Sequence, residues 1–160
     1  MRKNSWVVEG LVTGLIGYGT VVVLFAVVNV LSGKGLFHTA ALLGSALFFH
    51  AADTPVPVLG PAPIIAYNGV HILASLVIGL AAAWLIFETE KHRPLWYIVF
   101  FIFLAGFIYS TVIMGVLAAE ITEILPWPLI VASNFAAGVT AGGYLWWRHA
   151  RLFRELSRES

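Results

Sequence analysis

Hydrophobic residues in this chain form long blocks, separated by short segments rich in glycine, proline and charged residues. Five blocks are visible, at about residues 6–31, 36–52, 63–87, 95–119 and 129–147. A helix needs about 20 apolar residues to cross about 30 Å of hydrocarbon, and every block except the second is about that long. A helix also pairs its backbone amides within one segment, as lipid requires. The pattern therefore predicts an all-α fold, a polytopic membrane helical bundle in which residues 1–160 form a single integral membrane domain.

The second block is the shortest and the most polar of the five. Residues 36–52 are at the lower length limit for a transmembrane helix, and they include two histidines and two hydroxyl side chains. Two interpretations are open: a fifth spanning helix, or a short re-entrant segment beside four full spans. The distribution of basic residues favours four full spans, because Arg2 and Lys3 then lie on the side that holds most of the other Lys and Arg residues.

Residues that begin or end helices lie between the blocks. Residues 53–63 contain four prolines, which prevent a continuous helix there. Pro63 is expected to be the first helical residue of the third block, because the N–H that proline lacks has no partner at that position. Residues 88–93 are mostly charged and precede Pro94, so they are predicted to form a turn that ends this block.

Composition supports the assignment to a membrane. The chain is 60% hydrophobic and 11% charged, with a mean hydropathy of +0.92, whereas about a quarter of the residues are charged in soluble domains. The net charge is +1, and the basic residues lie at the ends of the apolar blocks instead of forming a patch, so no nucleic-acid partner is expected. The absence of cysteine excludes disulfides, iron–sulfur clusters and cysteine nucleophiles.

A basic tail, residues 148–160, follows the last block. Its arginines are Arg148, Arg151, Arg154 and Arg158. Lys91 and Arg93 are separated from this tail by two predicted spans, so they lie on the same side of the membrane. Because Lys and Arg accumulate on the cytoplasmic side, we predict an inner or plasma membrane protein with a cytoplasmic C-terminus. The tail arginines are expected to bind anionic lipid headgroups or a neighbouring subunit.

Two pairs of glycines are spaced four residues apart in predicted spans. Gly10 and Gly14 lie in the first block, and Gly138 and Gly142 lie in the last. Small residues at this spacing allow two helix backbones to approach closely in a membrane. We therefore predict that both pairs are helix-packing surfaces, and the partner helix can belong to this chain or to another subunit.

The third block carries a polar stripe, formed by Tyr67, Asn68, His71 and Ser75. The spacing of three and four residues places these side chains on one helix face, which continues through Gly79. Ionisable residues inside a membrane are candidates for function. His71 can be a ligand to haem or to a chlorophyll-type pigment, or part of a proton or quinone site. The alternative is a neutral imidazole that is hydrogen-bonded across a helix interface.

His50 is the one companion that the sequence offers to His71 for binding a cofactor. A bis-histidine haem requires imidazoles on opposite faces of one iron, and His50 is expected to lie nearer the membrane surface than His71. Glu9 is predicted to reach lipid headgroups or to pair with Arg2, Lys3 or the basic tail, as a shallow membrane charge can do at small cost; the alternative is a proton or cation ligand. The remaining histidines, among them His149, end their segments and are interpreted as solvated at the interface.

No catalytic motif of a soluble enzyme is present in the sequence, and no independent catalytic activity is expected. The favoured hypothesis is a small accessory or structural subunit of a larger membrane complex, such as a respiratory or photosynthetic one, with lipids and other membrane subunits as partners. One alternative is a haem- or pigment-binding subunit that uses His71. A second alternative is a homo-oligomeric channel or transporter, in which the polar stripe lines water.

Overall fold

The computed structural model describes residues 5–49, 60–92 and 126–150, together with isolated positions at 101, 105, 106, 108, 109 and 112. The helices in these ranges are α1 (Ser5–Leu31), α2 (His38–Phe48), α3 (Pro61–Lys91) and α5 (Trp127–Arg148). No strand occurs among the described residues. The helix predicted at residues 95–119 lies outside these ranges, apart from the isolated positions, as do the tail arginines beyond Arg148.

Three of these helices are long and apolar enough to cross a membrane, as the sequence predicts. They are α1 from Trp6 onward, with 26 residues, α3 with 31 and α5 with 22. In contrast, α2 has 11 residues, which at 1.5 Å per residue makes a helix about 16 Å long. That length is about half the thickness of the hydrocarbon region, so α2 is too short to cross it alone.

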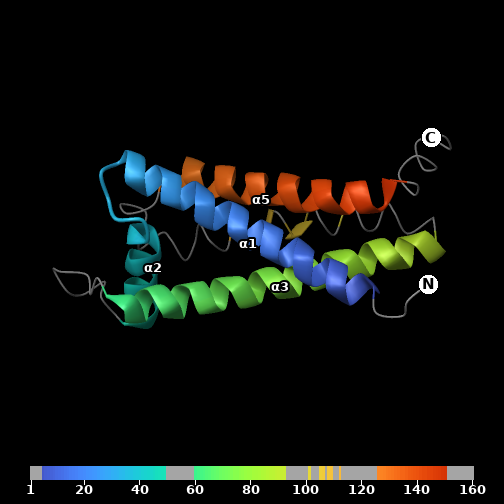
Figure 1. Cartoon of the computed structure of the whole chain (residues 1–160), viewed down its shortest axis with the longest axis horizontal. Helices are drawn as coiled ribbons and strands as arrows, with labels where there is room; N and C mark the ends of the chain where they lie inside the picture. Colours follow the sequence, from blue (N-terminus) through green and yellow to red (C-terminus); the bar gives the residue numbers. More distant parts are fainter. Residues whose placement is uncertain are drawn as a thin grey trace.

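The three long helices run along the long axis of the molecule, and α2 lies across one end of it (Figure 1). Contacts show that α1 is antiparallel to α3, because Gly10 lies beside Leu80 while Tyr18 bonds to Asn68. The chain therefore leaves α1 and enters α3 at the same end of the bundle, which we call the α2 end. The last turns of α3 and α5 meet the first turns of α1 at the opposite end, which we call the cluster end.

The helices α1 and α3 cross at a contact between glycines, which we call the glycine crossing: Gly10, Gly14 and Gly79. A Cβ atom on Gly14 would lie 2.6 Å from the carbonyl oxygen of Ser75. A Cβ atom on Gly79 would lie 2.7 Å from the Cα of Gly14 and still closer to the Gly10 carbonyl oxygen. The two backbones are thus too close for any side chain at these positions, which is the geometry that small residues permit in membranes.

Close packing also attaches α2 to the start of α3. A Cβ on Gly44 would collide with the carbonyl group of Pro63, and Leu43 packs with Ile130 of α5. At the cluster end, α5 contacts α3 through Leu145, which joins a buried group formed by Ala82, Ala83 and Ile86.

Both ends of α3 extend beyond the sequence-based prediction. The helix begins at Pro61 instead of Pro63, and Pro61 satisfies the same requirement for a first helical residue. At the other end, the helix continues through the predicted charged turn to Lys91. Its last turn is stabilised by an ion pair of 2.9 Å between Lys91 and Glu88, at the spacing of three residues that favours a helix. Polar residues therefore do not end this helix: they form its last turn.

Candidate functional site

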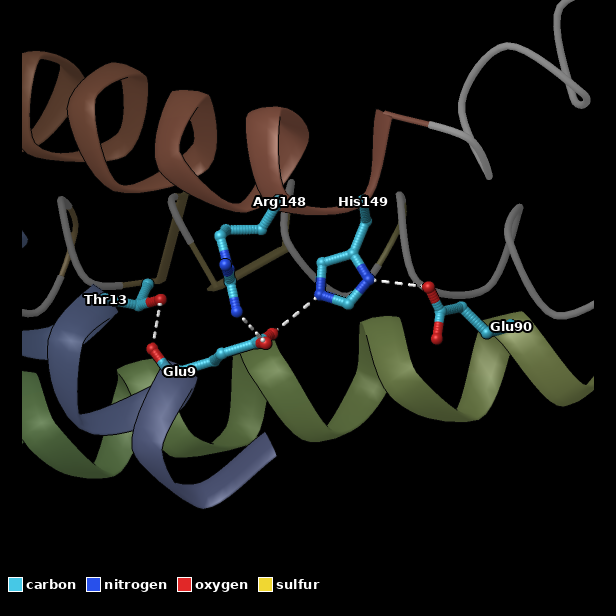
Figure 2. Close-up of polar contacts among 5 residues, drawn as sticks. All are labelled: Glu9, Thr13, Glu90, Arg148 and His149. Carbon is cyan, nitrogen blue, oxygen red and sulfur yellow. Dashed lines mark hydrogen bonds and ion pairs between the residues drawn. The ribbon is translucent and has the colours of Figure 1, made fainter. Parts of the chain in front are cut away.

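The cluster end holds four charged or titratable side chains in direct contact, which we call the ion-pair cluster: Glu9, Glu90, Arg148 and His149 (Figure 2). The Arg148 guanidinium donates to Glu9 Oε1 at 2.9 Å. The Nε2 atom of His149 lies 2.8 Å from Glu9 Oε2, and its Nδ1 atom lies 2.6 Å from Glu90 Oε1. One imidazole therefore bridges two carboxylates that come from α1 and α3.

Helix ends position these side chains. Glu9 lies in the second turn of α1, where Thr13 donates to its backbone carbonyl oxygen at 2.7 Å. Glu90 lies in the last turn of α3, and His149 caps α5 with its backbone N–H bonded to Leu145. The side chains of Glu9 and His149 are only 9% and 10% exposed, so the Glu9 carboxylate depends on these partners for the hydrogen bonds that water would otherwise supply.

One interpretation from the sequence changes at this site. His149 is not a solvated side chain at a helix end, because its ring lies nearly buried between two carboxylates. Arg148 pairs with Glu9 while 46% of its side chain stays exposed, and the lipid or partner binding expected of the tail arginines stays a prediction. The signal for this cluster was Glu9, a carboxylate within an apolar block, since such residues are nearly always paired. The sequence suggested the basic tail as one partner of Glu9 but did not identify His149.

The polar stripe of α3 faces α1 near the α2 end. Tyr18 of α1 donates its hydroxyl to Asn68 Oδ1 at 2.9 Å. Tyr18 and Tyr67 both approach the ring of His71, with centroids 5.4 and 5.6 Å away. The structure thus brings Tyr67, Asn68 and His71 together, whereas Ser75 lies at the glycine crossing. Within the described residues, the His71 ring makes these two aromatic contacts and no hydrogen bond.

A small cavity of about 30 Å³ lies between α1, α2 and the polar stripe. Its polar lining consists of Asn29, Thr39, Tyr67, Asn68 and His71. Thr39 donates to Asn29 Oδ1 at 2.7 Å, and Asn29 in turn donates to the carbonyl oxygen of Leu36 at 3.1 Å. A cavity of this volume has room for one or two water molecules and not for a macrocycle. His50, the expected companion of His71, lies outside the described residues.

The two predicted glycine pairs have different surroundings. Gly10 and Gly14 lie at the glycine crossing, whereas Gly138 and Gly142 of α5 have no described atom within 4 Å of an added Cβ. Where α5 meets α1, Ala141 lies 3.9 Å from a Cβ on Gly17. Beside it, the hydroxyls of Thr20 and Thr140 are hydrogen-bonded at 2.8 Å. In the described residues, α5 therefore packs on α1 through a face that adjoins its glycines.

The described ranges contain no group of three or more His, Asp and Glu side chains arranged to hold a metal ion. In the ion-pair cluster, the two carboxylates lie on opposite sides of the His149 ring and do not converge on one point (Figure 2). Comparison of this chain with protein-family models, with curated proteins and with solved structures found no match.

Proposed function

We propose that this chain is a small accessory or structural subunit of a larger membrane complex and has no catalytic activity of its own. The observation that supports this role is how the described polar side chains of the spans are used. Three pairs of them bond across helix contacts: Glu9 with Arg148, Tyr18 with Asn68, and Thr20 with Thr140. Polar groups used in this way hold helices together.

The small size of the cavity in the described part of the chain points in the same direction. Pockets that bind drug-sized ligands usually enclose about 300 to 1,000 Å³, against about 30 Å³ beside His71. Close helix packing around a cavity this small, in the described residues, is suited to supporting neighbouring subunits. A respiratory or photosynthetic complex is the assembly that we propose as host.

Mild extraction from native membranes, followed by a native gel and mass spectrometry of the co-migrating proteins, tests this role. We expect migration well above the monomer mass of 17.4 kDa, after allowance for bound detergent, with the same neighbours in independent preparations. A single band at monomer mass after gentle extraction would contradict the proposal.

We further propose four full spans, with the start of α1 and the end of α5 on the cytoplasmic side. The segment between α1 and α3 begins and ends at the α2 end, and α2 is too short to cross the membrane alone. Since α3 ends at the cluster end and α5 begins at the α2 end, the block at 95–119 is the remaining crossing that this arrangement requires. Lys34 is then the single Lys or Arg on the noncytoplasmic side, out of nine, in agreement with the positive-inside rule.

Cysteine labelling tests this topology directly, because the chain has no cysteine of its own. Single variants Asn4→Cys and Ser157→Cys are expected to react with a membrane-impermeant maleimide only after the cytoplasmic side is opened. The matched variant Gly35→Cys, in the turn before α2, is expected to react in intact cells. Labelling of Asn4→Cys from the same side as Gly35→Cys would refute the four-span arrangement.

A second candidate function is a haem- or pigment-binding subunit that uses His71. The observation in its favour is that the His71 imidazole lines the cavity and makes no hydrogen bond to a described residue. Binding of a macrocycle would require Tyr18 and Tyr67 to move away from the ring. A visible absorption spectrum of gently extracted protein is the test. Bands that disappear in His71→Ala would support this candidate, and their absence in the native protein would exclude it.

The glycine crossing makes a channel along the polar stripe the least favoured candidate. Backbone atoms of α1 and α3 are in contact at Gly14 and Ser75, so the contact lies where the polar stripe ends toward the cluster end. Water along this interface would have to pass the tightest contact between the two helices. Ion flux into liposomes that is lost in His71→Ala would revive the channel hypothesis.

A further inference from the structure

Both ring nitrogens of His149 face carboxylate oxygens at hydrogen-bond distance. Glu9 Oε2 lies 2.8 Å from Nε2, and Glu90 Oε1 lies 2.6 Å from Nδ1. A neutral imidazole has a proton on one nitrogen only, and an ionised carboxylate has none to give. With a neutral ring and two ionised carboxylates, one of the two contacts would place lone pairs against each other. The geometry therefore requires two protons, one along each N···O axis.

The surroundings of Glu9 determine where these protons lie. Arg148 donates to the other oxygen of Glu9 at 2.9 Å, and a guanidinium bond favours the ionised carboxylate. The Glu90 side chain is 28% exposed, so water contributes to the solvation of its charge. With both carboxylates ionised, both protons lie on the ring, and His149 donates to both carboxylates.

The charges of these four side chains balance one another. Two carboxylates, one guanidinium and one imidazolium sum to zero, so each carboxylate of the four has an opposite charge beside it. The next charged groups on α3 do not disturb this balance, since Lys91 pairs with Glu88 at 2.9 Å. Removal of one proton from the ring would leave a net negative charge at a site where Glu9 is almost fully buried.

We propose that Glu9, His149 and Glu90 form a proton-binding site, in which the bound proton lets His149 of α5 hold the ends of α1 and α3 at the same time. The ligand is the second ring proton of His149, which exchanges with the aqueous phase on the side of the exposed Glu90 carboxylate. Each axis joins two helices, the Nε2 axis α5 to α1 and the Nδ1 axis α5 to α3. Loss of the proton on the side of Glu90 therefore removes the Nδ1 contact between α5 and α3, while Arg148 still pairs with Glu9 of α1.

Nitrogen NMR of histidine-labelled protein in lipid bilayers tests the bound state in the native chain. We expect one-bond nitrogen–proton couplings on both ring nitrogens of His149 at neutral pH. The signal is assigned by its loss in His149→Gln. His92 is an internal control, because its carboxylate contact to Glu88 is 3.9 Å long and its side chain is 64% exposed. A single protonated nitrogen on His149 at neutral pH would overturn the proposal.

Distances between spin labels at the cluster end test whether the proton holds α5 on α3. Labels at Trp84 and Trp147, which are exposed on α3 and α5, are expected to shift to longer distances as the pH is raised, because the Nδ1 axis joins these two helices. A control pair at Ile65 and Trp127 reports on the same helices at the α2 end and is expected to stay constant. In a His149→Gln background the shift at the cluster end should vanish. An unchanged distance in the native background, or an equal shift with His149→Gln, would refute a contact between α5 and α3 that depends on the proton.

Discussion

The glycine crossing makes the substitution Gly79→Ala the sharpest test of how α1 and α3 are held together. An added Cβ would lie 2.7 Å from the Cα of Gly14 and closer still to the Gly10 carbonyl oxygen and the Gly14 nitrogen. Ordinary van der Waals contact begins at 3.4 Å, so the first of these distances is about 0.7 Å too short. All three atoms belong to the backbone, and a change of side-chain rotamer cannot relieve the collision. The helices must therefore separate.

The size of the effect follows from the cost of overpacking. Insertion of an extra methyl group into a tightly packed contact costs about 1–3 kcal/mol. Alanine also gains about 1 kcal/mol over glycine in helix propensity, which partly hides the steric cost. The matched control is Gly69→Ala on the same helix, where no described atom lies within 4 Å of the added Cβ. Because helix propensity acts equally on both variants, their difference isolates the steric cost.

Unfolding by a denaturing detergent, followed by circular dichroism and tryptophan fluorescence, measures this difference. We expect the unfolding free energy of Gly79→Ala to lie about 1–3 kcal/mol below that of Gly69→Ala. This difference corresponds to about a 5- to 140-fold change in the ratio of folded to unfolded protein. Equal unfolding midpoints for the two variants would show that α1 and α3 do not touch at Gly79, and the arrangement of the bundle would have to be revised.

Two further substitutions test hydrogen bonds near the α2 end. Tyr18→Phe removes the hydroxyl that donates to Asn68 at 2.9 Å. It is expected to lower the unfolding free energy by about 0.6 kcal/mol, and by no more than about 1.7 kcal/mol. A double-mutant cycle with Asn68→Ala measures this coupling, and a coupling of zero would contradict it. Thr39→Val keeps the shape of the side chain but leaves the buried Asn29 oxygen without its donor at 2.7 Å, so a loss of about 1–3 kcal/mol is expected. If the free energy of unfolding of Thr39→Val matches the native value, α2 is not attached to α1 in this way.

The positions of the long helices could be predicted closely from the sequence. The predicted boundaries at 6–31 and 129–147 differ from α1 and α5 by one or two residues, because an apolar block must be helical over the length that lies in lipid. The ends of α3 were predicted less well, since proline and charged residues permit a helix to begin or end at several positions. Pro61 and Pro63 satisfy the same rule for a first helical residue, and the structure begins α3 at Pro61.

The ion-pair cluster shows what the sequence could not supply. Glu9 and His149 are 140 positions apart, and no local pattern relates them. Their contact depends on the rotation of α1, α3 and α5 about their axes and on the depth at which the helices cross. The short distances at Gly10, Gly14 and Gly79 set that crossing for α1 and α3. A single sequence identifies these glycines as small residues but does not tell which helix each one meets.

The class of this protein, an all-helical chain with apolar segments of membrane-spanning length, follows from the amino-acid sequence, because hydropathy and backbone pairing in lipid are local properties. The packed bundle adds that α2 lies across one end and that α1 is antiparallel to both α3 and α5. It also places one histidine between two carboxylates. These features depend on contacts between residues far apart in the chain, whose free energies arise only when the helices pack against one another.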